Sequence, residues 1–232
     1  MEKKTIDGHF SDIKQLVVHI SVLFLLSFSV CYYFSGNIIT IAQNRLLPVT
    51  HELHYFSVIE PFFLQLKVAF MVALMSSMPF ILLRCGVYLL PVVRQKSSLM
   101  LYCIFGCILF FCGVFLAFEY LMPVVITMML KMGGSMLFML HASSFFGMIF
   151  ILLFACGVVL EVPLVMLALV KFNIITIGKL KKFRKFYIAL SFIAGAVFTP
   201  PDVISQVFVA GLMILLFEIT LFLLSLCKGT KE

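Results

Sequence analysis

The sequence predicts an all-α integral membrane protein with six transmembrane helices, and two features indicate this fold. Of the 232 residues, 63% are hydrophobic and only 12% are charged, and the mean hydropathy is +1.20. So few charges cannot cover the surface of a soluble domain, so the protein must be solvated by a bilayer. Lysine and arginine, in addition, gather in alternate segments between the apolar runs. We expect a single membrane domain over 1–232, with no room for a soluble enzyme domain.

Apolar windows of about 19 residues define the first four spans. The remaining apolar region, 186–226, is interrupted by the polar stretch FTPPDVISQ, residues 198–206. Two adjacent prolines would break the hydrogen-bond ladder of one long helix in lipid, which favours two shorter helices joined by a turn. The predicted spans are 16–34, 64–92, 99–129, 144–170, 186–198 and 203–226.

The basic residues predict the orientation of these spans. With the N-terminus inside, 14 of the 17 lysines and arginines fall in inner segments, and Arg45, Lys67 and Lys131 are left outside. A five-span alternative, with 186–226 as one helix, would place basic clusters on both faces. We therefore expect both termini on the inner side and interpret the net charge of +7 as an orientation signal, not a nucleic-acid surface.

The outer segment 35–61 mixes polar residues, including Pro48, with Leu, Ile, Phe and Tyr. An amphipathic cap on the outer surface and an irregular loop both fit this mixture. The fifth and sixth spans are also expected to be short. The fifth has 13 residues, or about 20 Å of helix against a hydrocarbon core of about 30 Å, and the sixth has only 15 residues from Val203 to Phe217 before Glu218. Such a mismatch should thin the bilayer or require neighbouring protein.

Glu161 is the most unusual residue, because it lies about 15 Å from the predicted inner boundary, near the middle of the bilayer. A carboxylate at that depth costs at least about 2.5 kcal/mol and must face a partner, water or a cavity. Pro163 would free a backbone carbonyl nearby and bend the helix. We interpret both as an intramembrane functional site, with a protonated structural group as the alternative for Glu161. Glu119 and Glu218 are weaker candidates.

Asp202 is suited to cap the last helix, which is predicted to begin near Val203, whereas capping does not explain Gln206. No nucleotide, haem, protease or hydrolase motif is present, and the seven cysteines form no CxxC pair. We expect no cofactor, no metal and no catalytic activity.

Motifs in order along nearly the whole chain resemble the TatC family of twin-arginine protein translocases. The N-terminal HFSDIK, residues 9–14, resembles the family's HLxELR entry to the first span, with Asp for Glu and Lys for Arg. The other matches are Glu60–Lys67, Pro79, Tyr88–Pro91, Gly113, Ala117, Pro123, Phe154–Gly157, Leu160–Pro163, Phe198–Gln206 and Phe217–Ile219.

The resemblance implies a glove-like receptor of six helices, which binds the signal peptides of folded cargo on its inner side. His9, Asp12 and Tyr88 match the family's signal-binding positions. The residues assigned to signal-peptide binding are His9, Asp12, Tyr88, Arg94 and Ser97. The family's acidic position in the first inner loop falls on Ser97, and the loop carries Arg94 and Lys96, which would repel an arginine pair.

The resemblance also implies partners: twin-arginine precursors, single-span proteins of the TatA and TatB type, and further copies of the chain in a larger complex. The single-span proteins are expected to dock along spans five and six, and Pro48 belongs to the outer cap. The residues assigned to partner docking are Thr199, Pro201, Asp202 and Gln206.

The favoured function is a translocase subunit that binds signal peptides and organises its partners for transport driven by the proton-motive force. A proton-coupled small-solute transporter using Glu161 is the alternative, and a respiratory-complex subunit a third hypothesis. The 27 phenylalanines, the absence of tryptophan and the altered inner loop favour the mitochondrial inner membrane over a bacterial plasma membrane or a plastid membrane.

Overall fold

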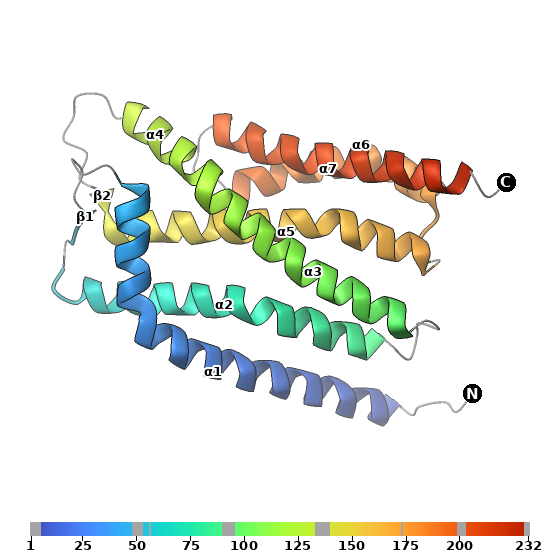
Figure 1. The fold of residues 1–232 in the computed structure, drawn as a ribbon, viewed down its shortest axis with the longest axis horizontal. Helices are drawn as coiled ribbons and strands as arrows, with labels where there is room; N and C mark the ends of the chain where they lie inside the picture. Colours follow the sequence, from blue (N-terminus) through green and yellow to red (C-terminus); the bar gives the residue numbers. More distant parts are fainter. Residues whose placement is uncertain are drawn as a thin grey trace. The chain divides into compact units, whose positions relative to one another are not determined.

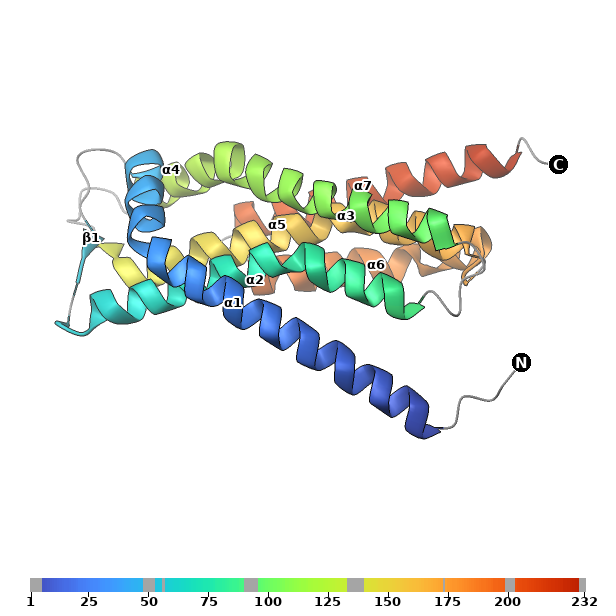
Figure 2. The same cartoon turned by 60° about the horizontal axis from the view of Figure 1, so that its bottom comes forward.

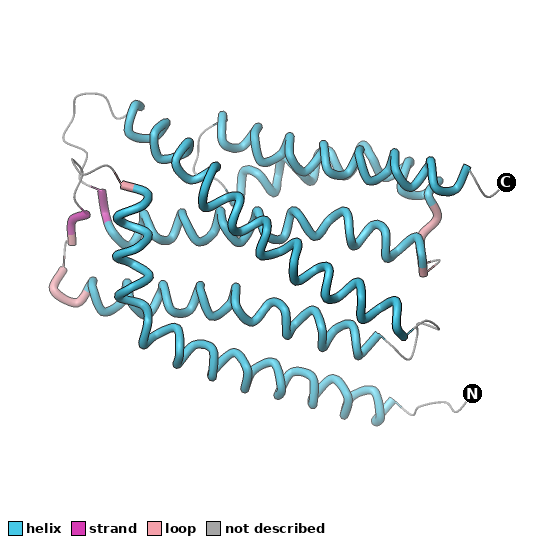
Figure 3. The backbone as a smooth tube through the Cα atoms, in the orientation of Figure 1, coloured by secondary structure: helices cyan, strands magenta, loops and turns pink. Residues whose placement is uncertain are grey.

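A computed structural model describes residues 6–47, 53–55, 57–89, 96–132, 140–172, 174–198 and 203–229. These residues are almost entirely helical, as Figures 1 and 3 show, which confirms the predicted all-α class. The helices are α1 (Ile6–Leu46), α2 (Glu60–Leu89), α3 (Lys96–Leu116), the π-helix η1 (Ala117–Leu121), α4 (Met122–Met132), α5 (Ala142–Lys171), α6 (Ile177–Phe198) and α7 (Val203–Gly229). The exception to the helices is a two-residue parallel strand pair, β1 (Leu53–His54) with β2 (Leu140–His141).

The chain forms two compact units. One comprises Met1–Cys107 with Leu140–Phe146, and the other comprises Ile108–Met139 with Gly147–Glu232. In the first unit α1 and α2 lie side by side (Figure 1). Phe24 of α1 contacts Phe70 of α2 edge to face, with ring centroids 5.4 Å apart. In the second unit, α5, α6 and α7 share a buried apolar cluster.

Helix α1 continues well past the predicted end of the first span at residue 34. It changes direction in its C-terminal part (Figures 1 and 2), and the pair Ser35–Gly36 supplies a sequence of the kind at which helices kink. Beyond this pair, Ile39, Ala42 and Leu46 are buried at helical spacing. The loop interpretation is therefore wrong for residues 35–46, which are helical with one buried face. Pro48 lies outside the described residues.

Helices α6 and α7 form an antiparallel hairpin. They lie side by side (Figure 1). Their directions are opposite, because Arg184 of α6 contacts Glu218 of α7, whereas the later residue Phe192 of α6 contacts the earlier residue Gln206 of α7. The five-span alternative, with one helix over 186–226, is therefore wrong. Helix α6 also begins at Ile177, before the predicted start at 186, because its basic first turns are helical as well.

Five helices of the described part are long and apolar enough to cross a membrane, and α6 is not among them. The reason lies in its sequence: lysines and an arginine occupy its first half, and the apolar part that follows has only 13 residues. The fifth span thus remains short in apolar length, although its helix is longer. The expectation of a short sixth helix is wrong, because α7 has 27 residues and its stretch Gln206–Leu226 is long and apolar enough to cross.

Two glycines allow α3 and α5 to approach closely in the second unit. A Cβ added to Gly113 would lie 2.7 Å from Leu160 Cδ1 and 2.8 Å from the carbonyl oxygen of Cys156. A Cβ added to Gly157 would lie 2.6 Å from Cε2 of Phe110, a ring that is fully buried. Small residues at such crossings let helix backbones meet in lipid, where tight packing drives association.

Candidate functional site

A groove in the second unit runs between α5 and α6, and Glu161 lies on its wall. Its cavity volume is about 560 Å³. From α5, the side chains of Val158, Glu161, Val165 and Leu169 follow one helical face along it. Pro163 lies inside α5, two residues after Glu161. Because proline has no backbone N–H, it donates no hydrogen bond to the carbonyl of the residue four positions earlier.

The opposite wall of the groove comes from α6, and its floor includes α7. Tyr187 of α6 is buried and stacks on the buried Phe217 of α7, with ring centroids 4.2 Å apart and planes 16° from parallel. Phe183 extends this aromatic surface, and Lys179 lies at the basic beginning of α6. The groove is thus apolar along its length, with a carboxyl group on one wall and an ammonium group from the other.

The carboxyl group of Glu161 is not satisfied within the described part of the chain. Its Oε1 atom is buried, and no hydrogen-bond partner for that atom is found there. A buried acceptor without a donor costs about 1–3 kcal/mol, and the cost is larger when the group is charged. Glu161 thus places an energetically costly acceptor on the wall of an otherwise apolar groove.

Glu218 of α7, in contrast, is fully engaged. Its two carboxylate oxygens accept hydrogen bonds from Arg184, at 2.7 Å from Nε and 2.6 Å from Nη2. This two-point pairing joins α6 to α7, and it explains Glu218 as a structural residue. The contrast singles out Glu161 as the acid whose role lies outside the hairpin's own packing.

Gln206 makes its hydrogen bond within the hairpin. Its Nε2 donates to the carbonyl oxygen of Phe192 at 3.2 Å, and its backbone oxygen lies 3.0 Å from a Cβ placed on Gly195. The side chain is only partly buried. The Gln206 amide therefore joins α7 to α6 near the turn of the hairpin.

The other predicted site residues fall at the limits of the described part. His9 and Asp12 lie in α1, Tyr88 in α2 and Ser97 in α3, but only their backbone is described. The remaining predicted residues, Arg94, Pro48, Thr199, Pro201 and Asp202, lie outside the described residues.

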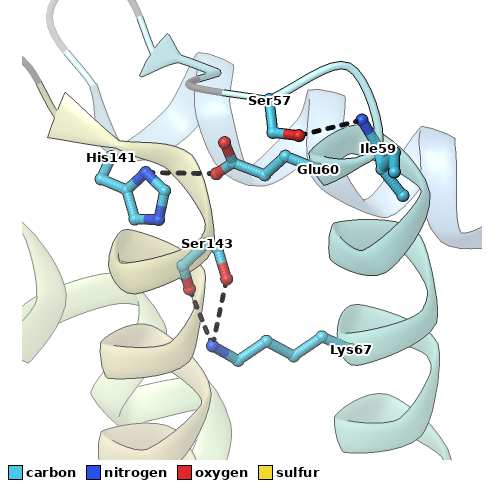
Figure 4. Close-up of polar contacts among 6 residues, drawn as sticks. All are labelled: Ser57, Ile59, Glu60, Lys67, His141 and Ser143. Atoms are coloured by element: carbon cyan, nitrogen blue, oxygen red, sulfur yellow. Dashed lines mark hydrogen bonds and ion pairs between the residues drawn. The ribbon is translucent and has the colours of Figure 1, made fainter.

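A polar cluster that sequence reasoning missed fastens the start of α5 to α2 within the first unit (Figure 4). Glu60 Oε1 lies 3.2 Å from Nδ1 of His141, and Lys67 Nζ donates to the carbonyl oxygen of Ser143 at 2.9 Å. His141 also belongs to β2, which pairs with β1. The signal available in the sequence was Lys67, a basic residue on the predicted outer side and close to a span.

Among the described residues, no group of three His, Cys, Asp or Glu side chains could hold a metal ion. The groove offers one carboxyl group, an aromatic hydroxyl and one ammonium group. This set is suited to hydrogen bonding with another molecule.

Comparison with known proteins agrees with this architecture. Residues 8–211 match the family described as Sec-independent protein translocase protein (TatC). A TatC protein of Rickettsia prowazekii is 26% identical, over 96% of this chain and 93% of the relative. One of Halothiobacillus neapolitanus is 29% identical over 93% of this chain, which spans only 60% of that longer relative.

A solved structure shows the same fold. The crystal structure described as the twin-arginine translocase receptor TatC superposes with a TM-score of 0.85 at 26% identity, covering 95% of this chain and 99% of the other. The helices and their order in this chain are therefore those of a known multi-pass membrane protein and not of an enzyme. The chain belongs to the TatC family of Sec-independent protein translocases.

Proposed function

We propose that this protein is the receptor subunit of a twin-arginine translocase, which binds signal peptides of folded proteins on its inner side. The observation that carries the proposal is the family match over residues 8–211, in a chain whose mid-membrane Glu161 has an unsatisfied oxygen. His9, Asp12 and Tyr88 are the proposed contacts for the signal peptide. Asp12 supplies negative charge that the Ser97 position lacks.

The proposed recognition is tested by photo-crosslinking in lipid vesicles that contain the full chain. A signal peptide with two adjacent arginines carries the photoreactive group, and the matched peptide has two lysines. Arginine pairs with a carboxylate at two points and lysine at one, so the arginine peptide should crosslink more strongly. Equal crosslinking of both peptides would contradict the proposal.

The subunit also organises single-span partners, and further copies of itself, for transport driven by the proton-motive force. The proposed docking residues are Thr199, Pro201, Asp202 and Gln206, at the outer turn of the hairpin. The position of Gln206 supports this placement, because its polar side chain is only partly buried near the turn and polar side chains in lipid favour hydrogen bonds with a neighbouring helix. Replacing Gln206 by Leu should weaken co-purification of such partners while leaving twin-arginine crosslinking unchanged.

No observation favours the small-solute transporter. Among the described residues that line the groove, Glu161 is the one acidic side chain, whereas a proton relay needs a series of such groups.

We further propose the mitochondrial inner membrane as the site of action. The support is compositional, namely 27 phenylalanines and no tryptophan. Fractionation of the source cells, with detection of the chain by antibody, tests the proposal, and recovery with a plasma membrane or plastid fraction would contradict it.

A further inference from the structure

The first half of α6 carries a positively charged face. Lys185 follows Lys181 by four residues and Lys182 by three, so the three side chains share one side of the helix. All three residues are exposed. Within the described part of the chain their ammonium groups have no ion-pair partner, whereas Arg184 pairs with Glu218. Like charges at this spacing repel one another and destabilise the helix, and an anionic ligand at this face would offset that repulsion.

The orientation of α6 in the membrane does not require this arrangement. The positive-inside rule counts basic residues near the end of a span and does not depend on the helix face on which they lie. Lys171 and Lys179 precede the charged face and already supply part of that count. The gathering of three lysines on one face is therefore a separate feature, which the orientation rule leaves unexplained.

Two exposed aromatic side chains accompany the charged face. Phe183 and Phe186 are 47% and 60% exposed, and their ring centroids are 4.8 Å apart. Another side of α6 is closed, because Leu180 and Tyr187 are buried in the apolar cluster of the second unit. A helix that presents lysine and phenylalanine together on its open surface is typical of the boundary between lipid headgroups and acyl chains.

The short apolar part of α6 places this face at the level of the headgroups. Only 13 apolar residues, 186–198, follow Lys185, and they give about 20 Å of helix against a hydrocarbon core of about 30 Å. A crossing helix of this apolar length places Lys185 about 10 Å inside the headgroup layer of an undisturbed bilayer. Phosphate groups that move toward the lysines, and lysine side chains that extend toward the phosphates, remove this mismatch.

From these observations we propose that the face formed by Lys181, Lys182 and Lys185 binds the phosphate groups of anionic phospholipids, in the leaflet that meets the start of α6. The ammonium groups contact the headgroups, and Phe183 and Phe186 contact the acyl chains. A soluble acidic polypeptide would match the charges but would leave the two rings uncovered. The inference goes beyond the proposed function and does not rest on it, because lipid binding needs neither a signal peptide nor a partner subunit.

Fluorescence quenching by brominated phospholipids tests the proposal with the full chain, in vesicles of phosphatidylcholine that contain a minor fraction of phosphatidylglycerol. The chain has no tryptophan, so Phe186→Trp supplies a single reporter beside the charged face. One lysine near an anionic membrane surface contributes about 1 kcal/mol, which is about fivefold in affinity. Phosphatidylglycerol should therefore be enriched at this reporter about fivefold or more over phosphatidylcholine. Equal quenching by the two brominated lipids overturns the proposal.

A second reporter on the same helix shows whether the enrichment is local. Val197→Trp replaces a valine that is 70% exposed near the other end of α6, 11 residues beyond Phe186. Quenching there should show no preference for phosphatidylglycerol, because no lysine or arginine of α6 lies near that end. A preference of the same size at both reporters overturns the proposal.

A variant that moves charge without removing it separates lipid binding from orientation. Lys182→Gln and Lys185→Gln take two ammonium groups off the face, and Ile174→Lys and Thr176→Lys restore them at exposed positions just before α6. This variant should lose most of the enrichment at the Phe186→Trp reporter. Lys182→Arg with Lys185→Arg keeps the charge on the face and should keep the enrichment. Enrichment that survives in the first variant, or is lost in the second, overturns the proposal.

Two competitors identify the ligand of the charged face. Inorganic phosphate and polyglutamate, each matched in ionic strength with chloride, should leave the enrichment unchanged, because neither offers acyl chains to the exposed rings. Loss of enrichment with inorganic phosphate overturns the proposal in favour of a site for free anions. Loss with polyglutamate overturns it in favour of an acidic polypeptide as occupant.

Discussion

At the scale of single residues, two acids in one region have opposite energetic roles. Glu218 has both oxygens in hydrogen bonds with Arg184, whereas Oε1 of Glu161 has no partner in the described chain. A group that is buried without compensation destabilises the fold that holds it. We therefore expect Glu161 to lower the stability of the fold.

This contrast predicts that replacing each acid by leucine has opposite effects on the free energy of unfolding. Glu161→Leu should leave the free energy of unfolding unchanged or raise it by about 1–3 kcal/mol, because it removes an unsatisfied acceptor. Glu218→Leu should lower it, since Arg184 would lose its partner. Denaturant titration in detergent measures both, and a clear loss of stability in Glu161→Leu would reveal a structural partner for that carboxyl group.

Ser97 provides the residue-scale test of signal recognition. A glutamate at this position would add a carboxylate to the first turn of α3, next to Lys96 and three residues after Arg94 in the sequence. We expect Ser97→Glu to increase crosslinking of the two-arginine peptide several-fold, with Ser97→Gln as the uncharged control. If Ser97→Glu gives no increase over the control, recognition does not use this position.

At the scale of helices, the hairpin of α6 and α7 depends on the pair Arg184–Glu218. The side chains are 51% and 35% exposed, so solvent screens their attraction. A double-mutant cycle with Arg184→Ala and Glu218→Ala should give a coupling energy of about 0.5–1 kcal/mol, which falls as salt is added. Lys185→Ala, at an exposed residue beside Arg184, is the control and should show no coupling to Glu218.

The crossing of α3 and α5 predicts a contrast between glycines. Gly113→Ala should destabilise the protein by about 1–3 kcal/mol, because the new methyl group would meet the Cys156 carbonyl oxygen and the backbones must separate. Gly211 of α7 has nothing within 4 Å of a Cβ, so Gly211→Ala should stabilise its helix by up to about 1 kcal/mol. Unfolding midpoints of the two variants, measured side by side, test this contrast. Equal shifts of the midpoint in Gly113→Ala and Gly211→Ala would show that α3 and α5 can move apart at their crossing without loss of stability.

The same scale shows what the sequence could and could not predict. Apolar runs and prolines located the helices, because lipid leaves the backbone few alternatives. The end of α1 and the start of α6 were missed, since residues 35–46 are mixed in polarity and residues 177–185 are basic, while hydropathy measures lipid contact and not helix formation. The Glu60–His141 contact depends on tertiary proximity between distant segments, and no local pattern encodes it. Glu161 could be identified from the sequence, because a carboxyl group at that depth in the membrane is unusual. The groove around it could not be predicted, because it forms only when three helices pack together.

At the scale of the whole molecule, two criteria give different numbers of membrane spans: helix length with hydropathy gives five, and the distribution of basic residues favours six. Five helices satisfy a length and hydropathy criterion, while the basic residues favour six crossings with α6 as a short one. With six, both termini lie on one side; with five, they lie on opposite sides. The 13 apolar residues of α6 can cross if the bilayer thins around the hairpin or neighbouring helices shield it.

Protease protection in sealed vesicles distinguishes the two arrangements. Epitope tags at the N-terminus and at the C-terminus should be digested together from one face, and a tag inserted between α4 and β2 should be digested only from the other. The hairpin is the element that decides this outcome, because the positive-inside rule predicts that the cluster Lys179, Lys181, Lys182 and Lys185 keeps the start of α6 on the inner side. Replacing these four lysines by glutamine removes most of that signal but keeps Arg184 for its pairing with Glu218, so the C-terminal tag should then divide between the two faces. Termini that are digested from opposite faces in the unaltered protein would mean that α6 lies at the surface and does not cross.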